Sequence, residues 1–225
     1  MTGRRFFSIL AFIALLQYFP TQAYAQQQNG SKQPSESEIK QIVAANWMSN
    51  YPDNKFYPEK ILTRSELASI MVKVFRLDKR PAASQSDVVL ADVPASHPAF
   101  RNIQLVVKTN IMKGYRGNLF FPNQKVTRAE GLAIFAQAYG VFQFSDETVR
   151  EILAPYADAA LIPTWARQAI ATVAAEGFIN TDAQNNISPL KPMTRGDMAY
   201  VLSQYLQRQQ AQPQTPEAPP APQNL

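Results

Sequence analysis

The sequence predicts a mainly α-helical domain made of three helix–loop–helix repeats, and two observations carry that prediction. The first is a Thr-Arg-x-acid motif that begins at Thr63, Thr127 and Thr194, so that the copies lie 64 and 67 residues apart. The second is apolar periodicity with helical spacing before and after every copy. One helix pair cannot hide both of its apolar faces, so we expect the three repeats to pack around a shared core.

The first helix of each repeat is predicted from apolar residues at relative positions 0, 3, 4 and 8, which mark one face of an α-helix. The three sets align without gaps when the copies are anchored on the threonines. They are Ile39, Ile42, Val43 and Trp47; Ile103, Val106, Val107 and Ile111; and Ile170, Val173, Ala174 and Phe178.

The second helix of each repeat is predicted to begin at the motif. The threonine as N-cap and the acid three residues later form a capping box, whose loss costs about 1 kcal/mol. Gly131 stands where the other copies carry Leu67 and Met198, which indicates either a close backbone approach or simple drift, and Gly140 is a helix stop. The apolar sets are Leu67, Ile70, Met71, Val74 and Phe75; Gly131, Ile134, Phe135, Ala138 and Tyr139; and Met198, Val201, Leu202, Tyr205 and Leu206.

The loop between the helices repeats an asparagine, an apolar residue and a proline at fixed distances before the threonine. Asparagine tolerates the left-handed backbone of a tight turn, the apolar residue enters the core, and proline fixes an extended approach to the next helix. The three sets are Asn54, Phe56 and Pro58; Asn118, Phe120 and Pro122; and Asn185, Ile187 and Pro189.

The ends of the chain are predicted to lie outside the repeats. Residues 1–25 combine a basic start, an apolar stretch and a small-x-small ending, which is typical of a secretory signal peptide, with an uncleaved anchor as the alternative. We expect a linker over 26–36 and a disordered Pro/Gln-rich tail over 208–225. The repeats then occupy 37–77, 87–141 and 152–207, and the first lacks the leading segment of the other two.

Composition argues against several classes of protein. The chain has no cysteine, so disulfides and lipid attachment at cysteine are excluded. Its net charge is +5 without any basic run, which disfavours a nucleic-acid binder. His97 is the only histidine, so a zinc site is not expected, and no nucleophile motif indicates an enzyme. We predict no metal and no cofactor.

These motifs resemble the S-layer homology (SLH) family. The second repeat reads "LADVPASHPAF" and then "MKGYRGNLFFPNQKVTRAE", the third "YADAALIPTWARQAI" and then "TDAQNNISPLKPMTRGD", and the first "NYPDNKFYPEKILTRSE". The likeness covers roughly residues 38–207. It implies a pseudo-threefold helical prism that binds acidic, often pyruvylated, polysaccharide linked to peptidoglycan. Pro98 stands where the family has Trp and Asp182 where it has Tyr, so not every groove need bind.

The arginines Arg64, Arg128 and Arg195 follow the threonines and so lie at the positive end of a helix dipole. A cation there is unfavourable by a few tenths of a kcal/mol, so something must offset it. One interpretation is an internal salt bridge to a carboxylate of the adjacent repeat. The other, which the resemblance favours, is an anionic ligand held by the guanidinium and the helix N-terminus together. On that interpretation Arg128→Ala changes only the surface and leaves stability within about 1 kcal/mol.

The remaining candidate glycan-binding residues come largely from the resemblance. Asp92 and Asp158 either cap the first helix or line the groove, and Trp165 is either a groove residue or part of the core. Tyr51 and Tyr115 lie in the loops and can present a ring with a polar tip. Lys125, with Lys60 and Lys191, precedes the motif and would add local positive charge beside the arginine.

Three functions follow as hypotheses. The first is a non-catalytic, exported protein of the cell envelope that binds anionic cell-wall polysaccharide. The second is a structural or adaptor protein whose repeats form a scaffold and whose Pro/Gln-rich tail recruits a protein partner. The third is a hydrolase acting on wall material, for which the sequence shows no catalytic motif.

Overall fold

The structure is a computed structural model and describes residues 33–81 and 86–211. The predicted mainly α-helical class is confirmed, and within the described ranges extended pairing is limited to isolated bridges. No helix in these ranges is long and apolar enough to cross a bilayer. The helices are α1 (Glu36–Ala44), α2 (Arg64–Phe75), α3 (Phe100–Lys108), α4 (Arg128–Tyr139), α5 (Asp146–Leu153), α6 (Arg167–Ala175) and α7 (Arg195–Ala211), with the 3₁₀ helices η2 (Leu77–Lys79), η3 (Ala159–Leu161) and η4 (Thr164–Ala166).

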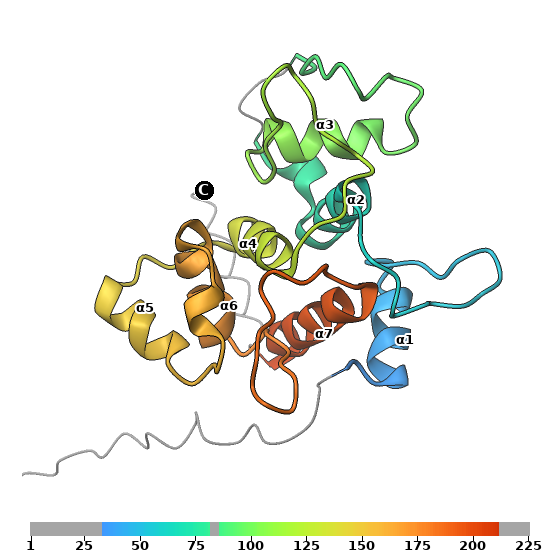
Figure 1. Cartoon of the computed structure of the whole chain (residues 1–225). Helices are drawn as coiled ribbons and strands as arrows, with labels where there is room; N and C mark the ends of the chain where they lie inside the picture. Colours follow the sequence, from blue (N-terminus) through green and yellow to red (C-terminus); the bar gives the residue numbers. More distant parts are fainter. Residues whose placement is uncertain (1–32, 82–85, 212–225) are drawn as a thin grey trace, which may run out of the picture.

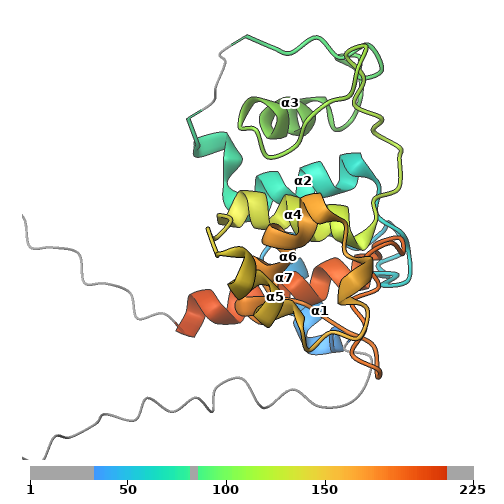
Figure 2. The ribbon, with the colours of Figure 1, turned by 60° about the vertical axis from the view of Figure 1, so that its left-hand side comes forward.

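The three predicted helix pairs are α1/α2, α3/α4 and α6/α7, and each pair exchanges contacts with its neighbours. The second helices α2, α4 and α7 lie together in the interior, with α1, α3 and α6 around them (Figure 1). Each second helix packs on the first helix of the next repeat: α2 on α3, α4 on α6, and α7 back on α1. Figure 2 shows α3 stacked on α2 at one end of the molecule. The repeats therefore form a closed ring with pseudo-threefold symmetry.

A triangle of backbone hydrogen bonds joins the repeats just before the second helices. The Leu62 N–H donates to the Met193 carbonyl at 2.9 Å, Met193 donates to Val126 at 2.9 Å, and Val126 donates to Leu62 at 3.2 Å. All three side chains are buried, so the ring satisfies backbone groups that water does not reach.

The caps and loops follow the prediction. Thr63 and Thr127 form capping boxes with their glutamates, and Thr194 exchanges bonds with Asp197 at 2.9 and 3.1 Å. The predicted left-handed asparagines are confirmed, with φ between 55° and 62°, at Asn54, Asn118 and Asn185. The residue before each proline also has positive φ, which the sequence analysis did not anticipate; these are Tyr57, Phe121 and Ser188.

The core contains the apolar residues that the loops and helices were predicted to bury. Phe120 and Ile187 are fully buried and Phe56 nearly so. Gly131 reflects a close approach rather than drift, because a Cβ there would lie 2.1 Å from the sulfur of Met193. Gly140 ends α4 as expected, with a φ of 121°.

The element boundaries differ from the prediction in three places. Ser35 caps α1 through a capping box with Glu38, so the expected linker ends earlier than residue 36. The last helix continues to Ala211 and includes residues expected in the tail. Helix α5 was missed; Ser145 caps it, and it packs on α6 between the second and third repeats. The predictions for 1–25 and for most of the linker and tail lie outside the described residues.

Candidate functional site

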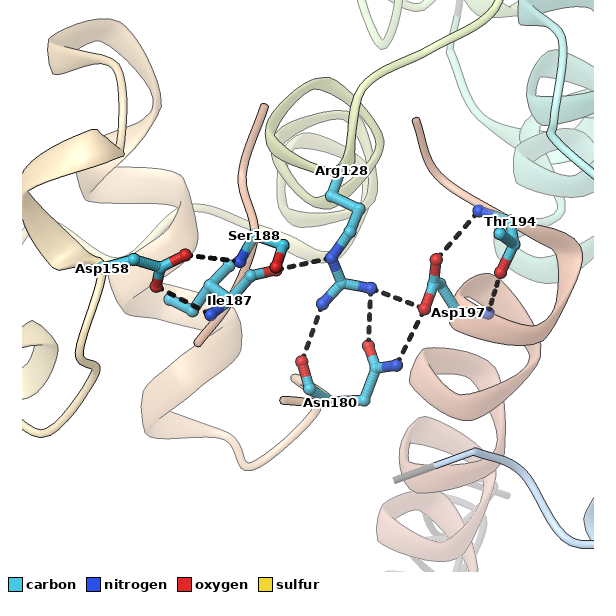
Figure 3. Close-up of polar contacts among 7 residues, drawn as sticks. All are labelled: Arg128, Asp158, Asn180, Ile187, Ser188, Thr194 and Asp197. Atoms are coloured by element: carbon cyan, nitrogen blue, oxygen red, sulfur yellow. Dashed lines mark hydrogen bonds and ion pairs between the residues drawn. The ribbon is translucent and has the colours of Figure 1, made fainter. Parts of the chain in front are cut away.

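The three motif arginines fasten neighbouring repeats together. Arg64, at the start of α2, donates from Nε to the Phe120 carbonyl and from Nη2 to the Lys113 carbonyl, both at 2.8 Å. Both acceptors belong to the loop of the second repeat. The same bonds run from Arg195 to Phe56 and Ser49 of the first repeat (2.9 and 2.6 Å), and from Arg128 to Ile187 and Asn180 of the third (2.6 and 2.7 Å; Figure 3).

The arginine side chains are buried, with exposed fractions of 5 to 7%. Burial lowers the pKa of Arg64 and of Arg195 from the usual value, because desolvation disfavours the charged form. The two loop carbonyls that accept from each guanidinium offset both this desolvation cost and the unfavourable position of a cation at a helix N-terminus. The expectation that Arg128→Ala alters only the surface is therefore wrong.

The helix N-termini are also occupied by the protein itself. At α2 the N–H groups of Arg64 and Ser65 donate to the Gln124 and Pro122 carbonyls of the second repeat, each at 2.9 Å. The equivalent pairs at α4 and α7 bind the loops of the third and first repeats. An anion held jointly by the guanidinium and the helix N-terminus, as expected from the sequence, has no free helix N–H to accept from at these two positions.

One nitrogen of Arg64 and of Arg195 is left for a ligand. In neither residue does Nη1 make a hydrogen bond to the described part of the chain. Among the described residues, every fully buried side-chain nitrogen or oxygen has a partner, so an unpaired Nη1 is not fully buried. Both side chains line grooves between repeats. Each Nη1 atom therefore keeps some exposure to solvent, on a side chain that lines a groove.

The two grooves are built from equivalent positions. The first groove has a volume of about 500 Å³, and the second groove has a volume of about 660 Å³. The first contains Tyr51, Glu66, Lys73, His97, Pro98 and Arg195. The second contains Arg64, Lys113, Tyr115, Glu130, Gln137 and Trp165.

Aromatic rings and cations meet in both grooves, in different proportions. The Tyr51 ring of the first groove has Lys60 Nζ 3.8 Å from its centroid and the Arg195 guanidinium carbon 4.9 Å from it. In the second groove Arg64 lies 4.9 Å from the centroid of Tyr115, and Trp165 is 63% exposed. Trp165 is therefore a groove residue and does not belong to the core.

The third interface between repeats is arranged differently, because side chains of the protein itself bind the remaining arginine nitrogen. Arg128 Nη1 lies 2.6 Å from Asp197 Oδ1 and donates to Asn180 Oδ1 at 3.0 Å (Figure 3). Asn180 also donates to Asp197 at 2.9 Å. Burial raises the pKa of Asp197, but Arg128, Asn180 and Thr194 together lower it by more than burial raises it. The pKa of this carboxyl therefore lies below its usual value. The predicted internal salt bridge thus exists for Arg128.

Asp92 and Asp158 hold loop backbone instead of capping the first helix or lining either groove. The carboxylate of Asp92 accepts the N–H groups of Phe120 and Phe121 at 2.8 and 2.6 Å. Asp158 does the same for the third repeat, at 2.8 and 2.7 Å (Figure 3). Each carboxylate therefore stabilises the left-handed residue that precedes the loop proline, while α3 begins without a side-chain cap.

Of the lysines before the motif, only Lys60 stacks on a groove tyrosine. Lys125 is exposed and lies outside the residues that line either groove. Lys73 and Lys113 line the first and the second groove and were not among the predicted site residues. Lys113 directly precedes the Gly-Tyr of the second loop, and this position was the available signal.

Comparison with known proteins gives one family and several relatives. The S-layer homology domain model matches residues 30–68, 90–130 and 155–199. The chain is 28% identical to a surface-layer 125 kDa protein of Lysinibacillus sphaericus over 94% of its own length, and 26% identical to a cellulosome-anchoring protein of Acetivibrio thermocellus over 73%. It is also 26% identical to an amylopullulanase of Thermoanaerobacterium thermosulfurigenes over 76% of its length.

The matches cover 18, 36 and 9% of these three relatives, so the chain spans only a minor part of each. Each matched region covers the first helix and the loop of one repeat and ends within the first turns of the second helix, so the three matches correspond to the three repeats of the ring. By its three matched repeats, the chain belongs to the S-layer homology domain family.

Proposed function

We propose that the protein is a non-catalytic component of the cell envelope that binds an acidic, wall-linked polysaccharide in the first and second grooves. The observation that carries this proposal is that Arg195 and Arg64 line the two grooves beside a tyrosine ring, each with an Nη1 atom that makes no hydrogen bond to the described residues. A guanidinium is a strong donor to carboxylates, and its other nitrogens here are already fixed by loop carbonyls. The donor is therefore held in position before any ligand arrives.

The groove walls fit the other parts of a sugar. The exposed ring of Trp165 offers an apolar face for stacking, while Tyr115 adds a ring with a polar tip. Lys60, which stacks on Tyr51 of the first groove, and Lys113, which lines the second groove, add positive charge. We infer an acidic residue such as a pyruvylated hexosamine as the recognised unit, since it combines a carboxylate with a sugar ring.

The relatives support attachment to the envelope. Their names describe a surface-layer protein and a cellulosome-anchoring protein. The same likeness extends to an amylopullulanase, of which only 9% is covered. What these proteins share with the chain is therefore a set of repeats carried beside very different activities, which favours anchoring over catalysis.

The proposal is tested by sedimentation of residues 26–225 with purified cell-wall sacculi. The protein should sediment with intact sacculi and stay in solution with sacculi stripped of acidic polysaccharide. Added salt should weaken binding, because it screens exposed charges. If the protein sediments with neither preparation, the polysaccharide proposal fails and the adaptor function, with a protein partner on the Pro/Gln-rich tail, becomes the better account.

Groove variants test the site itself. Trp165→Ala should weaken binding about fivefold, since an aromatic contact contributes on the order of 1 kcal/mol. The matched control is Leu190→Ala, which removes a side chain of similar exposure (59%) outside both grooves. Equal binding by the two variants would exclude Trp165 from the site.

A further inference from the structure

The three interfaces between repeats share one set of arginine hydrogen bonds but differ at one arginine nitrogen. In each, an arginine binds two loop carbonyls of the next repeat through Nε and Nη2. The interfaces differ in what reaches the third nitrogen, Nη1. At Arg64 and Arg195 this atom makes no hydrogen bond to the described residues, whereas at Arg128 it binds Asp197 and Asn180.

Two substitutions between the repeats account for this difference. Asn180 stands where the other loops have Ser49 and Lys113, and its carbonyl makes the same bond to arginine as theirs, so its side chain starts from the equivalent position. Asp197 stands where the other helices have Glu66 and Glu130. One oxygen of Asp197 accepts the Thr194 N–H, and the other reaches Arg128.

The glutamates do not make the corresponding ion pair. Glu66 and Glu130 each use Oε2 for the capping box, and no contact within ion-pairing distance joins them to Arg195 or Arg64 in the described residues. The longer side chain lines the groove instead of closing it. At the third interface the shorter Asp197 is only 7% exposed and is fixed by Asn180 as well.

We infer that the Asp197 carboxylate binds Arg128 in the place that a ligand carboxylate would take, so that the protein has two carbohydrate sites rather than three. This inference rests on the proposed function of the two open grooves. A carboxylate at Arg128 would have to displace a buried, hydrogen-bonded group that is covalently part of the chain. It would also find Asp182, which carries a negative charge, in place of the groove tyrosine.

Calorimetric titration of residues 26–225 with a monovalent probe tests this count. The probe is the methyl glycoside of a pyruvylated N-acetylhexosamine, with glucuronic acid as a second carboxylate-bearing sugar. Two sites per chain are expected, and three would overturn the inference while leaving the proposed function standing. Absence of heat and of sacculus binding together would instead remove the proposed function.

A second, independent test introduces the equivalents of Asn180 and Asp197 into the second groove. Lys113→Asn combined with Glu130→Asp reproduces at Arg64 the residues that surround Arg128. The number of sites should fall from two to one, with the affinity of the first groove unchanged. The single variants separate the contributions: each supplies only half of the pair, and Lys113→Asn alone measures the effect of losing the lysine charge.

Thermal unfolding accompanies the titration, so that loss of a site is distinguished from loss of the fold. If the double variant melts like the unaltered chain and still binds two probes, a carboxylate and an amide at these positions do not close a groove, and the inference is wrong. If the double variant does not fold, the count of sites in the unaltered chain still decides the matter.

Discussion

Arg128→Ala should be the most damaging of the three arginine truncations. It removes donors to the carbonyls of Ile187 and Asn180 and leaves the Asp197 carboxylate buried without its partner. Removal of one member of a buried ion pair costs about 3–5 kcal/mol. We therefore expect a loss of about 4 kcal/mol in the free energy of unfolding, which is a large share of the roughly 5–15 kcal/mol typical of a domain.

Arg64→Ala provides the internal comparison, because this side chain makes the same two carbonyl bonds and no ion pair with the described residues. Leaving those carbonyls unpaired should cost about 2 kcal/mol. The difference of about 2 kcal/mol between the variants is the contribution of Asp197, and it should disappear when both are compared in an Asp197→Ala background. Arg116→Ala, at an exposed position, should change stability by less than about 0.5 kcal/mol.

The assay is equilibrium unfolding in urea followed by far-ultraviolet circular dichroism. At this domain size each 1 kcal/mol corresponds to about 2–4 °C, so the midpoint of thermal unfolding should drop by roughly 8–16 °C for Arg128→Ala. A loss below about 1 kcal/mol, equal to that of Arg116→Ala, would refute the view that these arginines fasten the repeats and would restore a surface role.

Three further predictions follow from the packing. The folded pKa of Asp197 lies below its unfolded value near 3.8, so its contribution to stability is complete above about pH 4 and is lost as pH falls through the folded pKa; Asp197→Asn should flatten this acid limb in pH-dependent melting. Gly131→Ala should cost about 1–3 kcal/mol by overpacking against Met193, and Met193→Ala in the same chain should recover part of that cost in urea unfolding. Asp92→Ala should cost about 1–3 kcal/mol because it leaves the part-buried N–H of Phe120 without its acceptor, and hydrogen exchange should show faster opening confined to that loop.

Local rules predicted much of the fold. The capping threonines, the left-handed asparagines and the apolar helix faces depend on neighbouring residues in the chain, so the sequence contains their full explanation. The end of α4 at Gly140 follows from the same kind of rule. Helix α5 was missed although Ser145 and the spacing of Val149 and Leu153 were available as signals.

The roles of the arginines and aspartates were harder to predict, since they depend on docking between distant segments. Helix physics indicated that Arg64 needed a partner, but its partners are main-chain carbonyls, which any residue type supplies and no motif reveals. Asp92 likewise binds backbone N–H groups 28 and 29 residues away. Among the described residues, only Arg128 has the expected carboxylate of the neighbouring repeat as its partner.

The triangle of Leu62, Val126 and Met193 means that no repeat of this protein is terminal. Open repeat arrays can lengthen or shorten, because their end units meet solvent through capping surfaces. Here Arg195 of the third repeat binds the loop of the first. Deletion of any one repeat therefore leaves one arginine without its carbonyl acceptors and one loop without the arginine that binds it. The three repeats are therefore a single unit of folding, because removal of any one of them breaks two of the three interfaces.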